Sequence, residues 1–403
     1  MAYRTGRINS MNTLQTLAGK QIVVAVTGSI AAVEVVKLIH SLKRRGAVVQ
    51  AVMSAAATGI ISPEALTYAS GRETITRLTG KVEHVSYCGD EGTADLLLIA
   101  PCTANTIGKI ACGIDDTPVT TFVTTALGSE IPVLIVPAMH LSMYRHPALT
   151  DNIKRIRGWG VEILNPRIEE GKAKFAENEE IVLRCERAIL GHPLAGKRIL
   201  VTSGPCREPV DDIRILTTRS TGQMGRALAL QAFRLGADVT VVHRDTFPCV
   251  NNIRVESAAD MCSAVYHFFS ERGGADIYVS AAAISDFAPG RVAGKIPSGK
   301  SVSLQLEPLP KLLDDVIQRW APEIIAFKLG TDQEKEARKM LEYGIGMVLL
   351  NTPETMGCPD GDYQILTKTS RIHLVGIKDE IAKTVWDIHI RCGVVPECEK
   401  EPS

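Results

Sequence analysis

The sequence predicts an α/β fold in two domains, each with a doubly wound, mostly parallel sheet. Its 403 residues exceed the size at which one hydrophobic core usually suffices. In each half an apolar, β-branched run ends in a glycine turn and leads into a helical pattern: VAVTGSIAA at 24–32 and ILVTSGPCREP at 199–209. Such a turn presents backbone N–H groups to a phosphate, although a purely structural βα turn has the same composition.

The first half begins with a βαβ unit. We expect strands over 21–28 and 47–54, with a helix over 31–45 between them. Two nearly continuous apolar runs, at 95–101 and 132–139, are typical of parallel strands that are covered on both faces. Because such sheets bind ligands at the carboxyl ends of their strands, the residues that follow these strands are predicted to share one crevice.

A linker is predicted between the two halves. The first half closes with a helix over 181–188, and the segment that follows, GHPLAGK at 191–197, is rich in Gly and Pro. We therefore predict a flexible tail over 1–18, a first domain over 19–190 and a second domain over 191–403.

The second half repeats the α/β pattern. Strands are expected over 198–204 and 238–243 with a helix over 224–235 between them, and another strand begins at Asp276. The stretch over 370–390 predicts a final strand and an amphipathic helix, and the last residues are predicted to form a solvated tail.

Composition excludes several classes of protein. Lys and Arg total 45, as do Asp and Glu, so no bulk charge favours a nucleic acid or an anionic membrane. No apolar stretch is long enough to span a bilayer, and the first residues lack the apolar segment of a signal peptide. The ten cysteines include no C-x-x-C pair, which favours reduced thiols over a disulfide or zinc framework. We expect a cytoplasmic protein.

Four segments of the first half form an ordered constellation. They are TGSIAA at 27–32, His84, APCTANTIGKIACGIDD at 100–116 and PAMHLSMYRHP at 137–147. Singly, a lone His is usually a surface residue and Thr-Ala-Asn-Thr could be a helix cap. In this order and spacing they resemble the flavin-dependent cysteine decarboxylases, the family that includes phosphopantothenoylcysteine decarboxylase.

This resemblance implies bound FMN and a decarboxylase mechanism. His84 would be the base or electrostatic partner in oxidation of the substrate thiol, and His140 would contact the substrate carboxylate. Short hydroxyl and amide side chains suit the polar parts of FMN. The implied flavin-binding residues are Gly28, Ser29, Ser54, Thr103, Asn105 and Met139.

Two features depart from the pattern of the family. His140 replaces the Asn of bacterial Pro-Ala-Met-Asn. The flap over 167–181, which in bacterial members carries the Cys that donates a proton, has no Cys. Lys172 and Lys174 are candidates by position only, and the favoured interpretation of each is a solvated lysine on a loop, so the proton donor stays open.

The second half resembles phosphopantothenate-cysteine ligase. A Rossmann dehydrogenase would need G-x-G-x-x-G after its first strand and an acidic residue at the end of its second. This chain has SGPCREP and His243 at those places. The motifs that carry the resemblance are TSGPCREPVDDIR at 202–214, RSTGQMGRALA at 219–229, SAAAISDFAP at 280–289, GKIPSG at 294–299, LPKLLD at 309–314 and LLNTPETMG at 349–357.

The resemblance to the ligase implies activation of 4'-phosphopantothenate by CTP, with Mg²⁺ or Mn²⁺, before attack by L-cysteine. Lys295 would stabilise charge on the phosphates, Asp286 would contact the nucleotide or its metal, and Arg214 would contact the substrate. Tyr343 replaces a nucleotide-binding Lys of many members, which leaves CTP or ATP open. Thr218 replaces an Asn of bacterial members, which leaves open how the acyl intermediate is bound; no metal ligand set is assigned. The other implied nucleotide contacts are Ala282, Pro310, Lys311, Leu312, Leu313, Phe327 and Lys339.

Together the two resemblances imply a bifunctional enzyme of coenzyme A biosynthesis. The ligase product is the decarboxylase substrate, so the fusion is chemically coherent. Trimeric decarboxylases and dimeric ligases combine only in a larger closed assembly, so a homo-oligomer, possibly a dodecamer, is implied by analogy. The alternatives are a flavin prenyltransferase or peptide cysteine decarboxylase, which leave the second half unexplained, and a flavin-binding regulatory subunit.

Overall fold

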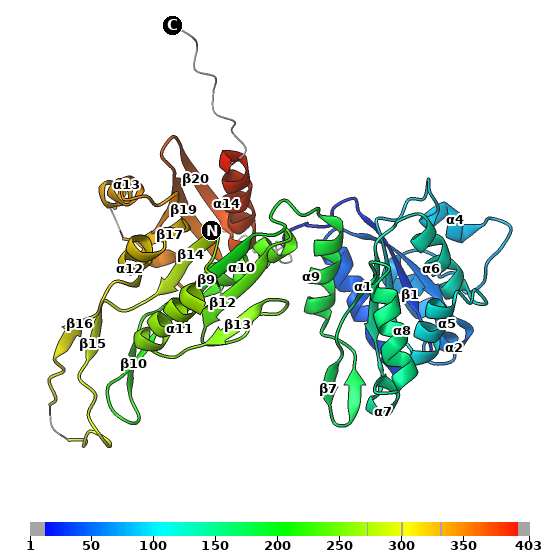
Figure 1. Ribbon diagram of the computed structural model, residues 1–403, viewed down its shortest axis with the longest axis horizontal. Helices are drawn as coiled ribbons and strands as arrows, with labels where there is room; N and C mark the ends of the chain where they lie inside the picture. The colour runs from blue at the N-terminus through cyan, green and yellow to red at the C-terminus, as the bar shows by residue number, and fades with distance from the viewer. Residues whose placement is uncertain (1–12, 272, 300, 331–332, 394–403) are drawn as a thin grey trace, which may run out of the picture. The chain divides into compact units, whose positions relative to one another are not determined.

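The computed structural model describes residues 13–393 except 272, 300, 331 and 332 (Figure 1). It divides into two compact units, Met1–Gly191 and His192–Ser403. None of the described helices has the length and apolar character that a membrane span requires.

The first unit is a parallel five-stranded sheet with the order β2-β1-β3-β4-β6. This is the flavodoxin-like order, in which the direction of winding reverses between the first and third strands. The predicted doubly wound fold is therefore confirmed. The strands are β1 (Gln21–Val26), β2 (Val48–Met53), β3 (Leu96–Cys102), β4 (Val133–Pro137) and β6 (Glu162–Ile163).

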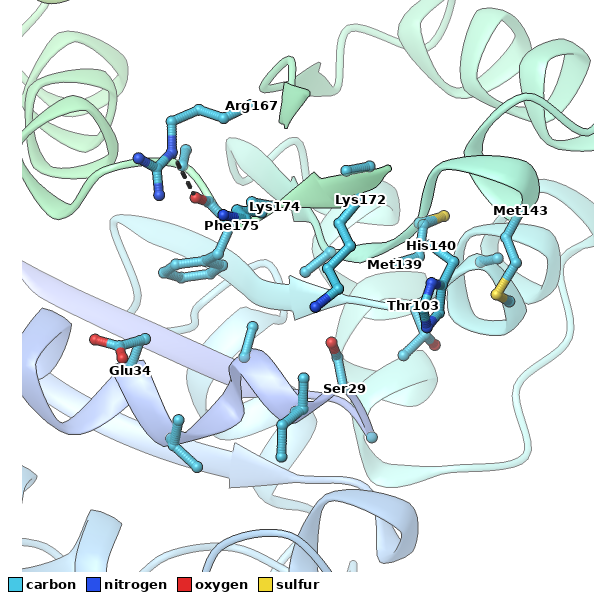
Figure 2. Close-up of a pocket in the computed structure, with 18 of the residues that line it drawn as sticks. Ser29, Glu34, Thr103, Met139, His140, Met143, Arg167, Lys172, Lys174 and Phe175 are labelled. Atoms are coloured by element: carbon cyan, nitrogen blue, oxygen red, sulfur yellow. Dashed lines mark hydrogen bonds between the residues drawn. The ribbon is translucent and has the colours of Figure 1, made fainter. Parts of the chain in front are cut away.

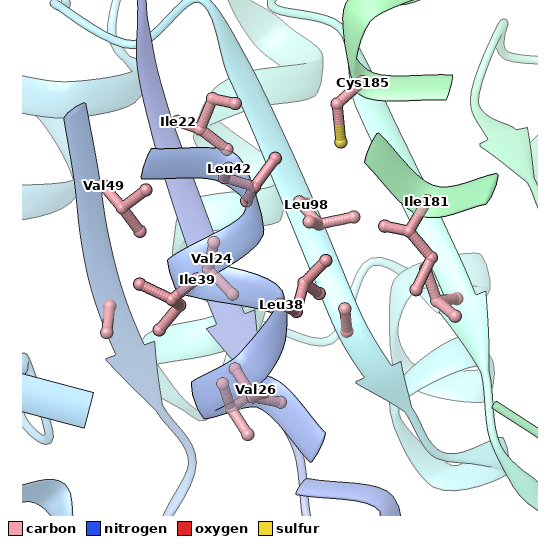
Figure 3. Close-up of a cluster of buried hydrophobic side chains, with 14 of the residues drawn as sticks. Ile22, Val24, Val26, Leu38, Ile39, Leu42, Val49, Leu98, Ile181 and Cys185 are labelled. Carbon is pink, nitrogen blue, oxygen red and sulfur yellow. The ribbon is translucent and has the colours of Figure 1, made fainter. Parts of the chain in front are cut away.

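Side chains of β1 alternate between two cores on opposite faces of this sheet. Ile22, Val24 and Val26 pack with η1 (Ile30–Glu34), α1 (Val35–Arg44) and α9 (Asn178–Ile189) on one face (Figure 3). Val23 and Ala25 pack on the other face, as the two-residue repeat of a strand requires. The remaining helices are α2 (Ala55–Thr58), α3 (Pro63–Ser70), α4 (Glu83–Cys88), α5 (Ala104–Cys112), α6 (Pro118–Gly128), α7 (Leu141–Tyr144) and α8 (Pro147–Arg157).

A second, antiparallel sheet of the first unit has the order β5-β8-β7. It consists of β5 (Met139–His140), β7 (Arg167–Glu169) and β8 (Lys172–Lys174). The turn between β7 and β8 has two residues, Glu170 and Gly171, with φ of 50° and 69°, values that suit a type I′ hairpin. In this sheet the flap segment, residues 167–181, pairs through β8 with β5, the strand that contains His140.

The second unit has an eight-stranded sheet with the order β13-β12-β9-β14-β17-β18-β19-β20. Its first six strands are parallel and follow the Rossmann order, and its last two are antiparallel. The predicted Rossmann-like fold is confirmed. The strands are β9 (Arg198–Pro205), β12 (Asp238–His243), β13 (Asn251–Arg254), β14 (Ile277–Ala283), β17 (Glu323–Leu329), β18 (Met347–Asn351), β19 (Asp360–Leu366) and β20 (Arg371–Ile377).

Helices of the second unit pack on this sheet around a core in which α11 (Ala258–Glu271), α12 (Leu312–Arg319) and α13 (Glu334–Glu342) take part. Elsewhere α10 (Gln223–Arg234) contacts α14 (Lys378–Gly393), and the buried Trp386 indole donates to the Leu228 carbonyl at 3.0 Å. Smaller elements are β10 (Arg207–Pro209) with β11 (Ile215–Thr217), β15 (Phe287–Pro289) with β16 (Leu306–Pro308), and η2 (Pro353–Thr355).

The predicted N-terminal tail is too long. Residues 1–12, like the tail after 393, lie outside the described residues, but 13–18 pack on the first unit. Leu17 is buried and its N–H donates to the Arg45 carbonyl at 2.8 Å, while the Thr16 hydroxyl bonds the Glu186 carboxylate. Burial of Leu17 fixes this segment, because exposing a leucine side chain costs about 2 kcal/mol.

Candidate active sites

The first unit holds a cavity of about 840 Å³ at the carboxyl ends of β1, β3 and β4 (Figure 2). This is the place where the winding of the sheet reverses, as expected for a ligand site of a doubly wound fold. Its volume is within the usual range for small-molecule and cofactor sites. Five predicted residues line it: Gly28, Ser29, Thr103, Met139 and His140.

Thr27 holds the floor of this cavity together. Its buried hydroxyl donates to the Pro101 carbonyl at 2.8 Å and accepts from the Thr103 N–H at 3.0 Å. The ends of β1 and β3 are thereby fixed to each other. Thr27 was not among the predicted site residues; the available signal was a hydroxyl at a strand end inside the TGSIAA motif.

The two residues after Thr27 differ in what they do. A Cβ on Gly28 would lie 2.6 Å from the Ala56 Cβ, so glycine is required for the close approach of α2. Ser29 precedes η1, but its side chain makes no capping hydrogen bond, and its hydroxyl points toward Lys172 across the cavity (Figure 2). This hydroxyl is therefore placed to meet a ligand.

Three predicted residues of the first site lie outside the lining of this cavity: Ser54, Asn105 and His84. The Ser54 hydroxyl caps α2 by accepting from the Ala57 N–H at 3.3 Å, and Asn105 is exposed on the first turn of α5. His84 lies on α4, and its buried Nδ1 has no hydrogen-bond partner among the described residues. Their roles stay predictions.

The second unit holds a cavity of about 770 Å³ beside the carboxyl ends of β14 and β17. It gathers residues from two of the quoted motifs, at 280–289 and 309–314, and from later segments that contain Phe327 and Lys339. Tyr343, which replaces a Lys of the family pattern, also lines it. Eight of the nine predicted nucleotide contacts line it: Ala282, Asp286, Pro310, Lys311, Leu312, Leu313, Phe327 and Lys339.

Lys339 already has an ionic partner at this cavity. Its ammonium donates a hydrogen bond to the Glu336 carboxylate at 2.9 Å, and this bond, together with the charge of Glu336, raises the pKa of Lys339. Both side chains are about half exposed, so the pair adds little stability. A bound phosphate could replace Glu336 at small cost.

A neighbouring cavity of about 690 Å³ shares the Ala282–Asp286 wall and Phe327 with the first. Its lining includes the start of α10, where Gly222 has a φ of 73°, and Thr218, whose buried Oγ1 has no partner among the described residues. Lys378 lies at its edge, and burial lowers the pKa of this lysine. No sequence motif pointed to Lys378.

Lys295 and Arg214 meet outside both of these cavities. The segment around Lys295 lies between β15 and β16, in a ribbon that projects from the sheet (Figure 1). Two carboxylates fix it: Asp211 accepts from the Ile296 N–H and Asp212 from the Gly294 N–H, each at 3.0 Å. The Arg214 guanidinium donates to Asp211 and to the Ile296 carbonyl.

The buried Asp211 carboxylate is ionised over the whole neutral range. Burial raises the pKa of its carboxyl, but three backbone N–H groups and Arg214 outweigh this effect and hold the pKa well below its ordinary value. By accepting from the Ile296 N–H, Asp211 fixes the backbone directly after Lys295. Asp211 was not among the predicted site residues. Its position in the quoted motif at 202–214 was the only signal.

The glycine turn predicted after the first strand of the second unit lies at the end of β9, where Gly204 pairs with Ala282, and it lines neither of the two cavities. Gly204 has a φ of 79°, and a Cβ there would lie 2.8 Å from the His243 ring. The Ser203 hydroxyl donates to the Gly222 carbonyl at 3.1 Å. Protein atoms therefore fill the space in which a phosphate could have bound.

Metal binding is not evident from the protein ligands alone. Within the part of the chain that the structure describes, no group of three or more His, Cys, Asp or Glu side chains is arranged to hold a metal ion. A metal at the second site would need ligands from a bound nucleotide, as is common for Mg²⁺.

Comparison with known proteins covers both units. The family model "Flavoprotein" matches residues 10–189, and "DNA/pantothenate metabolism flavoprotein C-terminal domain" matches 194–391. The coenzyme A biosynthesis bifunctional protein CoaBC of Thermococcus kodakarensis is 45% identical over 92% of this chain and 95% of its own. CoaBC of Methanocaldococcus jannaschii is 33% identical over 92% and 93%.

Among solved structures, the C-terminal domain of a CoaBC is 30% identical, covers 50% of this chain and 97% of its own, and has a TM-score of 0.41. The family assignment rests on the sequence relatives, which span both units in the same order. This chain belongs to the family of bifunctional coenzyme A biosynthesis proteins CoaBC.

Proposed function

We propose that this chain joins 4'-phosphopantothenate to cysteine with its second unit and decarboxylates the resulting conjugate to 4'-phosphopantetheine with its first. The observation that carries the proposal is the 45% identity to a CoaBC protein across both units. The two units each hold a separate cavity at strand ends, as two consecutive reactions on one chain require.

The residues of the first cavity fit FMN. Its lining is mainly apolar, with Met139, Met143 and Phe175, and the hydroxyls of Ser29 and Thr103 lie at the strand ends. Apolar walls suit the flavin ring, and hydroxyls suit its phosphate and ribityl chain. When bound, FMN would accept two electrons from the substrate thiol carbon and later return them.

The residues of the chain have three tasks in this step. His84 accepts the thiol proton, a task that suits an imidazole nitrogen with a free lone pair. His140 binds the substrate carboxylate with an imidazole N–H. Thr27 keeps the strand ends, and with them the cavity, in a fixed geometry.

In the second unit we propose that the nucleotide lies in the cavity lined by Asp286, Phe327 and Lys339. Lys295 stabilises the negative charge that grows as the carboxylate displaces pyrophosphate. Mg²⁺ would neutralise the phosphates further. The carboxylate end of the substrate lies in the adjoining cavity, next to the shared wall.

We further propose that other copies of this chain complete both sites. His84 and Lys295 each lie outside the cavity of their own unit, although each is assigned a chemical role there. A closed homo-oligomer would bring them to the cavities of neighbouring copies. Sedimentation or light scattering of the purified chain tests this, and an active monomer would contradict it.

The decarboxylase half is tested with synthetic 4'-phosphopantothenoylcysteine and the flavin-loaded protein. We expect release of CO₂ and formation of 4'-phosphopantetheine, and loss of both in His84→Asn with FMN still bound. Unchanged turnover in that variant would remove His84 from the mechanism, and no CO₂ from the wild type would remove the function.

The ligase half is tested by mixing the protein with 4'-phosphopantothenate, cysteine, Mg²⁺ and CTP or ATP in turn. We expect the nucleoside monophosphate and the cysteine conjugate in equal amounts. A Lys295→Ala variant should lose both products together. Failure to ligate with either nucleotide would contradict this half.

A further inference from the structure

Decarboxylation replaces a carboxylate by a hydrogen on the same carbon, so a proton must reach that carbon after CO₂ leaves. This requirement rests on the proposed function of the first unit. The donor must line the cavity and must hold a proton that it can release. The titratable side chains that line it are Glu34, His140, Arg167, Lys172, Lys174 and Glu177.

Three cationic or anionic groups at this cavity are already paired. Lys174 lies 3.1 Å from Glu169 and 2.9 Å from Glu170, and the hydrogen bonds that it donates to Glu170 and then to Glu169 raise its pKa. Arg167 bonds Glu177, and a guanidinium does not release its proton. These groups hold the hairpin together instead.

Glu34 and Glu177 are unsuitable for another reason. Glu34 lies 3.2 Å from Lys37 and Glu177 bonds Arg167, so each carboxylate is engaged with a cation of the protein. Two of the six side chains then remain, His140 and Lys172.

His140 and Lys172 are cross-strand partners. The register of β5 and β8 places their Cα atoms opposite each other, so their side chains lie on the same face of the small sheet, within about 5.5 Å at Cβ. Figure 2 shows both directed into the cavity, with the Lys172 nitrogen toward Ser29.

The Lys172 ammonium forms no ion pair within the part of the chain that the structure describes. Among the described residues it has no acidic group within salt-bridge distance of 4.0 Å. Glu169 is its other cross-strand partner, but that carboxylate bonds Lys174. The pKa of Glu170 is lowered mainly by its hydrogen bond from Lys174, and Lys172 contributes only through a weaker charge effect.

We propose that the Lys172 ammonium is the proton donor of the decarboxylase site, next to a substrate carboxylate held by His140. The bond to CO₂ breaks, and its electron pair becomes part of an ene-thiolate. A proton from Nζ then forms the new C–H bond and regenerates a C=S group. Lys172 is left neutral and regains a proton from water, so one proton enters and one CO₂ leaves.

The order of these steps predicts how much CO₂ is released, and which organic product forms, when the proton donor is missing. Only the C=S group can take back the two electrons, because an ene-thiolate has no electron-poor carbon. Without the donor, the protein should release one CO₂ per bound flavin and stop. The organic product should then be two mass units lighter than 4'-phosphopantetheine.

The experiment uses the full-length, flavin-loaded Lys172→Arg variant. Arginine keeps the positive charge but does not release its proton. We expect the yield of 4'-phosphopantetheine to fall at least about 100-fold, the usual contribution of a general acid, with the lighter product detected by mass spectrometry. Binding of 4'-phosphopantothenoylcysteine to the flavin-free variant, measured by calorimetry, should be unchanged.

Lys154→Arg is the matched control, because it makes the same exchange at an exposed lysine of α8 that does not line the cavity, and it should leave product mass and yield unchanged. Lys174→Arg makes the exchange on the same strand and face as Lys172; formation of the lighter product by this variant to the same extent would assign the effect to the hairpin and overturn the proposal. Normal 4'-phosphopantetheine formation by Lys172→Arg would overturn it while the decarboxylase function stands. A wild type that releases no CO₂ would overturn both.

Discussion

The glycine turn after β1 lines a cavity, whereas the equivalent turn after β9 is filled by protein. Gly28 and Ser29 face open space, but Gly204 lies against the His243 ring and Ser203 bonds the Gly222 carbonyl. In sequence the two turns look alike. The difference teaches that a strand–glycine turn binds a ligand only where the neighbouring strand ends leave room beside it.

The packed turn still serves the ligase site, but at a distance. The chain runs from it through β10 to Asp211, which fixes the segment that carries Lys295. The residues that line the proposed nucleotide cavity of the second unit lie instead at and beyond the ends of β14 and β17. The first turn thus lines a cavity directly, while the second supports a segment outside the cavities.

The largest effect is expected from Gly204→Ala. A Cβ at this positive φ is strained and overlaps the His243 ring, so the second unit should lose about 3 kcal/mol or more of unfolding free energy. Urea unfolding followed by fluorescence of the buried Trp386 measures this. Flavin binding should be unaffected, and an undisturbed second unit would contradict the packed turn.

Gly28→Ala is the counterpart in the open turn. Its Cβ would also overlap, with Ala56, but its φ is not positive, so we expect a smaller loss of about 1–3 kcal/mol. Because α2 must move, flavin content per chain should fall as well. Full flavin content with normal stability would show that the turn adapts.

Asp211→Asn tests the support that the second turn provides. The folded-state pKa of Asp211 is depressed, so its stabilising contribution is complete above the unfolded value of about 4 and is lost as the pH falls through the folded value. At pH 7 the variant should be less stable than the wild type, because the carboxylate that accepts the Ile296 N–H and pairs with Arg214 is replaced by a neutral amide. The difference from wild type should shrink below pH 4, and ligation should fall while nucleotide binding persists.

The smallest effects come from a matched pair of serines. Ser203→Ala removes a buried hydrogen bond and should cost about 1–2 kcal/mol of stability, without changing nucleotide affinity. Ser29→Ala removes a hydroxyl that makes no capping bond and should weaken flavin binding about tenfold, without changing stability. Equilibrium unfolding and flavin titration of both variants distinguish the two turns, and matching responses would contradict the comparison.

Much of the fold could be predicted because strand and helix periodicity is strong in both units. The eight predicted nucleotide contacts line one cavity; Asp286 could be placed there because it follows a parallel strand, but Pro310–Leu313 follow the antiparallel β16 and were placed by their motif alone. By contrast, the positions of His84 and Lys295 outside their cavities could not be predicted. Neither periodicity nor motif order determines where the short helix α4 or the segment between β15 and β16 lies relative to the sheet. Lys378 reaches its cavity from a helix whose sequence looks ordinary.

The position of Lys172 depends on the length of its hairpin more than on any neighbouring side chain. With two residues at the turn, Glu170 and Gly171, the ammonium falls opposite His140. Inserting or deleting one residue there would turn Lys172 to the far face of the small sheet. Such a change in spacing should abolish formation of the decarboxylated product, although every charged residue of the flap would still be present. The number of residues in this turn therefore decides whether the hairpin can donate a proton.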